Sequence, residues 1–123
     1  MISIQVIIFL MFIHFLADFG LQTHNQAVNK SSSNEYLLMH VGVYSLCWLI
    51  AMGLWTGSFG SAVLFATMTF VCHFLTDYIT SRISKSFFDK KDFHNGFVIV
   101  GFDQLLHYIQ LIFTYLFVIT YFK

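Results

Sequence analysis

The chain has 123 residues, of which 58% are hydrophobic and 20% aromatic, whereas only 10% are Asp, Glu, Lys or Arg. Roughly 25% of a typical soluble domain is charged, so this composition leaves too little polar surface to cover a water-soluble globule. Six basic residues balance six acidic ones, so there is no basic excess to bind phosphate backbones. The composition therefore excludes a soluble enzyme, a nucleic-acid-binding protein and a disordered tail.

Four apolar stretches follow one another, each about as long as the roughly 20 residues that a transmembrane helix needs. In lipid every backbone amide must be hydrogen-bonded internally, and the chain contains no proline, so we predict helices. The expected fold is all-α: an integral membrane four-helix bundle that forms a single domain over residues 1–123. Gly57 and Gly60 predict a tight turn between the second and third spans. The predicted spans cover residues 2–21, 36–55, 61–83 and 96–122.

The basic residues predict how the spans are oriented. Lys30 follows the first span, and the connection between the third and fourth spans carries Arg82, Lys85, Lys90 and Lys91. These two connections lie on the same side of the membrane, and the positive-inside rule places that side in the cytoplasm. We therefore predict that loops 22–35 and 84–95 are cytoplasmic and that both termini are outside.

Half of the acidic residues lie inside predicted spans, where charge is costly. Asp18, Asp77 and Asp103 each cost about 2.5–3.5 kcal/mol near the centre of a membrane helix. Ionisable residues at such positions usually mark a functional site. These three carboxylates therefore require compensating partners nearby.

Two of the aspartates belong to a repeated motif. His14 and Asp18 enclose the string HFLAD, and His73 and Asp77 enclose the string HFLTD. A spacing of four residues places imidazole and carboxylate on the same face of a helix. The repeat indicates that the chain is a duplicated helical hairpin.

The other two spans add further imidazoles and a carboxylate. The predicted topology places all of these side chains in the cytoplasmic half of the bundle. Four imidazoles and three carboxylates are too many for one tetrahedral ion, but they suit two ions with a bridging aspartate and an open water position. Helical bundles build dimetal sites from such carboxylate–histidine pairs. The predicted ligands are His14, Asp18, His40, His73, Asp77, Asp103 and His107.

The donor types narrow the choice of metal and of catalytic groups. Imidazoles and carboxylates without thiolates suit zinc, manganese or iron. Asp18, Asp77 and Asp103 are the candidate catalytic residues, because a carboxylate that does not bind metal can act as a general base. The alternative is a buried proton-relay network of His and Asp side chains.

Four more polar residues are candidates for binding a substrate. Lys30 and Arg82 could attract an anionic head group at the cytoplasmic face. The positive-inside bias is the simpler explanation for both residues. Gln104 lies beside Asp103 and Gln22 lies just after the first span, and both could also orient the predicted ligands.

These motifs resemble a family of small bacterial and phage membrane proteins catalogued as domain of unknown function 3307. The resemblance extends over nearly the whole chain and implies a multi-pass protein of the inner membrane of a bacterium or phage-infected host. The family brings no settled activity. More loosely, the layout is similar to bacterial membrane-bound metal-dependent hydrolases. The residues that carry the resemblance are the string HFLADFGLQ from His14 to Gln22, Lys30, the pair His73 and Asp77, and the string from Asp103 through Gln104 to His107.

Three functional hypotheses follow. The first is a metal-dependent hydrolase that acts on a lipid or lipid-linked phosphoester, with membrane lipid as its partner. The second is a channel or transporter for protons or divalent cations, which would need a homo-oligomer because four helices are few for a pathway. The third is a noncatalytic membrane accessory protein with a structural metal site.

Overall fold

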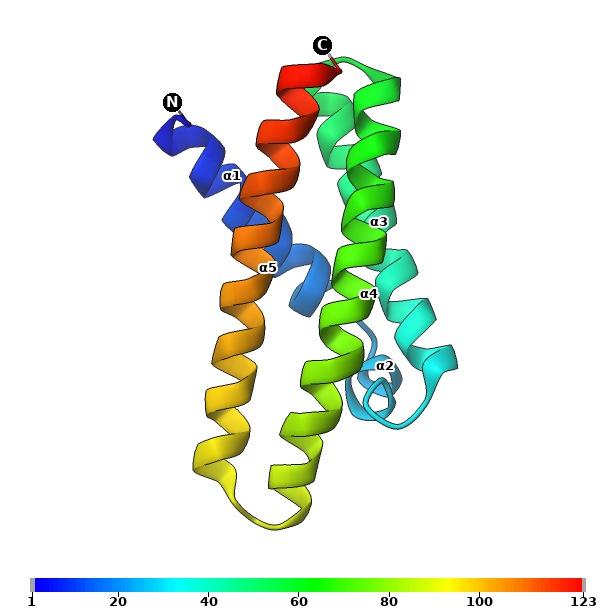
Figure 1. Cartoon of the computed structure of the whole chain (residues 1–123). Coiled ribbons are helices and arrows are strands. Elements are labelled where there is room, and N and C mark those ends of the chain that lie inside the picture. The colour runs from blue at the N-terminus through cyan, green and yellow to red at the C-terminus, as the bar shows by residue number, and fades with distance from the viewer. Residues whose placement is uncertain (1, 123) are drawn as a thin grey trace.

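The computed structural model describes residues 2–122, which are all-α and contain no β-strand. This confirms the all-α part of the predicted fold class. Five α-helices and one π-helical segment, labelled η1, make up this part of the chain (Figure 1). They are α1 (Ile4–Phe15), η1 (Leu16–Gly20), α2 (His24–Asn29), α3 (Asn34–Thr56), α4 (Phe59–Asp89) and α5 (Phe93–Tyr121).

Three of the helices are long and apolar enough to cross a membrane. The helices α3, α4 and α5 have 23, 31 and 29 residues, which correspond to about 34, 46 and 44 Å. The apolar helix Ile4–Gly20, formed by α1 and η1, is shorter. These lengths and compositions indicate a membrane protein.

The connections differ from those expected from hydropathy. The helix α4 continues to Asp89, so the predicted loop 84–95 is wrong in extent, and the actual connection to α5 spans only residues 90–92. The predicted loop 22–35 contains the short helix α2. Thr23 starts α2 with a capping box, because its side chain accepts from the Gln26 amide while the Gln26 side chain accepts from the Thr23 amide. A short polar helix such as α2 gives no signal when helices are predicted from apolar stretches.

The tight turn predicted after the second span is present. The helix α3 ends at Thr56 and is capped by Gly57, whose φ of 67° lies in the left-handed region that favours glycine. Ser58 then caps α4, because its hydroxyl accepts from the Ser61 amide. A second glycine is required at the other end of the bundle: a Cβ on Gly96 would lie 2.4 Å from the Phe88 ring.

The helix α4 packs against both α3 and α5, and α1 crosses obliquely between α3 and α5 (Figure 1). The start of α1, the α3–α4 turn and the end of α5 lie at one end of the molecule, and the α4–α5 connection lies at the other. The apolar core fills the half with the α3–α4 turn, where Leu10, Trp48, Met52 and Phe65 are buried together. The polar cluster lies next to this core, farther toward the α4–α5 connection.

The two proposed repeats differ in form. Asp77 lies within a continuous α4, whereas Asp18 lies in the π segment that follows α1. The first pair of long segments is joined through α2, and the second pair is joined by three residues. The two aspartates of the HFLxD repeat therefore lie in the same polar cluster, although the backbone around them differs.

Candidate metal centre

The structure brings the seven predicted ligands together. Six of them are buried, each with at most 2% of its surface exposed, and the seventh, Asp103, is half-buried. They come from four segments: α1 with η1, α3, α4 and α5. The polar side chains of sequence-distant segments thus meet in one place rather than facing outward.

Four of the residues form a compact group, which we call the tight cluster: Asp18, His40, His73 and Asp77. The Oδ1 atom of Asp18 lies 3.0 Å from Nε2 of His40 and 3.5 Å from Nε2 of His73. The Oδ2 atom of Asp77 lies 3.5 Å from each of these two nitrogens. The two Nε2 atoms lie 3.1 Å apart.

These separations are close to the edges of a tetrahedral coordination shell. Zinc binds imidazole nitrogen and carboxylate oxygen at about 2.0–2.2 Å, so the ligand atoms of an ideal tetrahedron lie about 3.3–3.6 Å apart. Three of the distances above, each 3.5 Å, lie in this range, and the other two, 3.0 and 3.1 Å, are slightly shorter. The four side chains therefore fit one tetrahedral ion with little movement.

A second group, which we call the open cluster, consists of Asp18, Asp103 and His107, whose ligand atoms lie within 4.8 Å of one another. Asp18 belongs to both clusters and so lies where a bridging carboxylate would lie. The Nε2 atom of His107 lies 3.0 Å from Asp77 Oδ1 and 3.4 Å from Asp103 Oδ2. This group is looser and supplies three ligands instead of four.

The π segment accounts for the position of Asp18. The amide of Leu21 donates to the carbonyl of Leu16 at 2.9 Å, a hydrogen bond across five residues that defines a π turn. Asp18 lies inside this turn, 3.0 Å from His40 but 3.7 Å from His14, its neighbour four residues earlier. Asp77, which lies in a regular α-helix, shows the same preference: it is 3.0 Å from His107 and 3.5 Å from His73, its neighbour four residues earlier.

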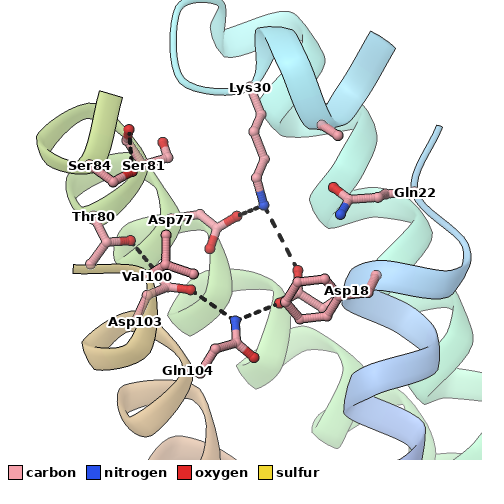
Figure 2. Close-up of a pocket in the computed structure, with 12 residues that line it drawn as sticks. Asp18, Gln22, Lys30, Asp77, Thr80, Ser81, Ser84, Val100, Asp103 and Gln104 are labelled. Carbon is pink, nitrogen blue, oxygen red and sulfur yellow. Dashed lines mark hydrogen bonds and ion pairs between the residues drawn. The ribbon is translucent and has the colours of Figure 1, made fainter. Parts of the chain in front are cut away.

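Lys30 places an ammonium group against the tight cluster (Figure 2). Its Nζ atom lies 2.8 Å from Asp77 Oδ2 and 3.9 Å from Asp18 Oδ1, and its side chain is 18% exposed. Burial alone would lower the pKa of Lys30, but the carboxylates of Asp77 and Asp18 outweigh burial and raise the pKa above its ordinary value. Lys30 is therefore a charged member of the site.

The charges of the site do not cancel within the protein. Asp18, Asp77 and Asp103 contribute three negative charges, and Lys30 supplies one positive charge when the imidazoles are neutral. Buried charge of one sign is costly unless it is paired. One divalent cation would complete the neutralisation.

His14 belongs to neither cluster, although it lies beside them. The amide nitrogen of Gln104 donates to Asp18 and Asp103 at 3.0 and 3.1 Å, so its carbonyl accepts from Nε2 of His14 at 2.9 Å. The other ring nitrogen, Nδ1, then accepts from the hydroxyl of Tyr44 at 3.0 Å. Both ring nitrogens of His14 are thus engaged, and His14 and Gln104 hold the two carboxylates in place.

Sequence reasoning missed two residues of this network. Tyr44 bonds His14 and stacks on the His73 ring at 3.8 Å between centroids, and His73 stacks in turn on His107 at 4.2 Å. Thr80 donates a hydrogen bond to Asp103. Helical spacing could have found both, because Tyr44 follows a predicted ligand by four residues and Thr80 follows another by three.

A cavity of about 160 Å³ opens beside the site (Figure 2). Asp18, Asp77 and Asp103 lie in its wall together with three of the four predicted substrate-binding residues, namely Gln22, Lys30 and Gln104. Arg82 is not part of this wall. Its guanidinium instead bonds Asn34 and the Tyr78 carbonyl and lies over the Tyr78 ring.

The fold and the site define a class: an all-α protein with three membrane-length helices around a buried His/Asp cluster that could hold a metal ion. The chain belongs to the family described as Protein of unknown function (DUF3307), whose family model matches residues 6–123. No curated protein matches the chain, and no solved structure does. The looser similarity to metal-dependent hydrolases gains no support from these comparisons.

Proposed function

We propose that this protein is a membrane-embedded, metal-dependent hydrolase that cleaves a lipid or lipid-linked phosphoester at the cytoplasmic face. The observation that carries the proposal is the tight cluster, in which five distances between ligand atoms of different residues lie within about 0.3 Å of the edges of a tetrahedral shell. The types of donor favour zinc, manganese or iron.

Two ions account for the arrangement better than one. The tight cluster offers four protein ligands, which close the shell of a tetrahedral ion, as in structural sites. The open cluster offers three protein ligands and leaves one position for water, as in catalytic sites. Asp18 and Asp103 of the open cluster also line the cavity, so that position is accessible to a substrate. The ions would lower the pKa of a bound water and clamp phosphoryl oxygens.

The charge of the loaded site favours a phosphoester over a neutral substrate. Two divalent ions and Lys30 would exceed the three carboxylates by two positive charges. A phosphoryl group with two negative charges would balance this excess. Lys30, in the cavity wall, is placed to contact such a group.

The proposed topology follows the distribution of the basic side chains. The cavity wall extends along α4 from Asp77 to Ser84, toward the α4–α5 connection. That connection lies at the opposite end of the molecule from the α3–α4 turn (Figure 1) and carries Lys90 and Lys91. The positive-inside rule assigns this end to the cytoplasm. A substrate head group would then reach the cavity from the cytoplasmic leaflet.

Elemental analysis of detergent-purified protein tests the metal directly. We expect close to two ions per chain in the wild type and a loss of at least one in His73→Ala. His94→Ala is the matched control, because His94 is exposed near the start of α5. A wild-type protein that is folded but contains far less than one ion per chain would refute metal binding.

Release of inorganic phosphate from dioleoyl phosphatidic acid in mixed micelles tests hydrolysis. We expect metal-dependent release that is lost in Asp103→Asn. Stoichiometric metal without turnover on any lipid phosphoester would instead support a structural metal site. Metal-dependent uptake of cations into proteoliposomes, abolished by Asp77→Asn, would support a transporter.

A further inference from the structure

Two neighbouring spaces in the structure differ sharply in polarity. The first is the cavity beside the metal centre, which we call the polar cavity. The second, the α4–α5 groove, has a volume of about 270 Å³ and lies between the two longest helices. Leu75, Ile79 and Ile83 of α4 and Ile99, Phe102 and Leu106 of α5 line the groove. Thr80 lines both spaces, so they adjoin at this residue.

The polar cavity has hydrogen-bonding capacity that the protein does not use. The Oγ atom of Ser81 and the Oε1 atom of Gln22 are buried, and within residues 2–122 neither has a hydrogen-bond partner. Buried polar atoms are normally paired, and leaving one unpaired costs free energy. The volume of about 160 Å³ far exceeds the roughly 10–15 Å³ that one water needs on the same measure. The cavity is therefore suited to a polar group larger than water.

The α4–α5 groove offers no free hydrogen-bonding group. Its two hydroxyls are already engaged: the Thr80 hydroxyl shares its one proton between the Thr76 carbonyl and Asp103, and Gln110 donates to the Thr76 hydroxyl. A polar or peptide ligand in the groove would leave its own polar groups unpaired. A hydrocarbon chain has no such groups, and it gains by burial against the aliphatic side chains of the two helices.

Thr80 is placed to separate the two environments. Its hydroxyl donates a hydrogen bond to Asp103, which lines the polar cavity. The same residue also borders the groove, beside Ile79 and Ile83. A ligand that extends across Thr80 would therefore have one part in a polar environment and the adjoining part in an apolar one.

We infer that the two spaces together bind one amphiphile: a lipid whose phosphoryl head group lies in the polar cavity and whose hydrocarbon chain lies in the α4–α5 groove. This inference rests on the proposed function for the reaction at the head group. It adds the position of the lipid in the protein: the hydrocarbon chain lies between α4 and α5 and does not pass through the loops. It also assigns Ser81 and Gln22 to head-group binding and Ile79 to chain binding.

Native mass spectrometry of the detergent-solubilised protein tests this position. The probe is a dioleoyl phosphonate analogue of phosphatidic acid, which binds without being hydrolysed. Inorganic phosphate and dioleoylglycerol are tested beside it, since they carry the head group and the chains alone. We expect one phosphonate lipid per chain, bound at least tenfold more tightly than either partial ligand.

Two pairs of variants locate the ligand. Ile79→Trp fills the groove and is expected to weaken binding of the phosphonate lipid at least tenfold, while phosphate binding is unchanged. Its control is Ile109→Trp, on an exposed position of α5 outside the groove. Ser81→Leu fills the polar cavity and is expected to weaken both ligands, whereas the exposed Ser86→Leu leaves both unchanged.

The outcomes separate this inference from the proposed function. Equal lipid binding by Ile79→Trp and Ile109→Trp, or equal affinity for dioleoylglycerol and the phosphonate lipid, would overturn the inferred position of the lipid. Phosphate release from phosphatidic acid that continues in Ile79→Trp would refute this position and leave the hydrolase intact. Binding of the phosphonate lipid that is weakened by Ile79→Trp, in a protein that contains no metal and releases no phosphate, would refute the hydrolase and leave the lipid site intact.

Discussion

Replacement of Lys30 by Met tests whether the ammonium group neutralises the buried carboxylates. The Nζ atom lies 2.8 Å from Asp77 Oδ2, and at an effective dielectric constant of about 20 this separation gives an attraction of about 6 kcal/mol. Desolvation of the lysine offsets part of that attraction. Removing one partner of a buried pair typically costs about 3–5 kcal/mol, and we expect a loss of this size in metal-free protein.

A divalent cation should reduce this loss, because it supplies the charge that the variant lacks. The free energy of unfolding is measured by denaturant titration in mixed micelles, once with a chelator and once with zinc. We expect the gap between wild type and Lys30→Met to be several kcal/mol with chelator and clearly smaller with zinc.

Lys85→Met is the matched control for this experiment. Lys85 pairs with Asp89 at 2.6 Å, but both side chains are exposed, by 41% and 63%. Such surface pairs contribute about 0–1 kcal/mol, so the control should unfold almost like the wild type under both conditions. If Lys30→Met is no less stable than Lys85→Met in chelator, the buried charge of the site is neutralised by something other than Lys30.

Three further substitutions test other parts of the structure. Gly96→Ala places a methyl group against the Phe88 ring and should cost about 1–3 kcal/mol of unfolding free energy, which Phe88→Ala in the same chain should largely restore. Tyr44→Phe leaves the buried Nδ1 of His14 without its donor and should cost about 1–3 kcal/mol, with metal content unchanged by elemental analysis. Hydrogen bonds from Asn95 hold the pKa of Asp92 below its usual value, so the stability from this cap is present above pH 4 and lost as the pH falls through the lower folded pKa. Asp92→Ala should remove that acid-dependent part of the unfolding curve.

Much of the site could be predicted from local sequence. Charge inside an apolar span and a spacing of four residues sufficed to select His73 and Asp77, which lie in a regular helix. The same reasoning identified Asp18. The π turn in which Asp18 lies was not predicted, because the residues LADFG carry no local signal that distinguishes a π turn from a regular α-helix.

Contacts between distant segments were harder to predict than the segments themselves. Lys30 could be explained by the positive-inside bias alone, and only the position of α2 places its ammonium within 2.8 Å of Asp77. The role of His14 depends on the orientation of the Gln104 amide, which is fixed by two carboxylates from different helices. Such networks are three-dimensional, so they leave no periodic signal in the sequence.

The facing imidazoles of His40 and His73 show why the cluster favours a cation. Their Nε2 atoms lie 3.1 Å apart, and within the described residues neither Nδ1 has a hydrogen-bond partner. Ligation through both Nε2 atoms keeps the protons on Nδ1, and two unpaired buried donors cost about 1–3 kcal/mol each. Structural zinc contributes about 10–16 kcal/mol at pH 7 in small domains. Metal binding on this scale would outweigh the cost of the two unpaired donors, whereas without metal the Nε2 atom of His40 has Asp18, His73 and the Lys30 ammonium as its hydrogen-bonding neighbours.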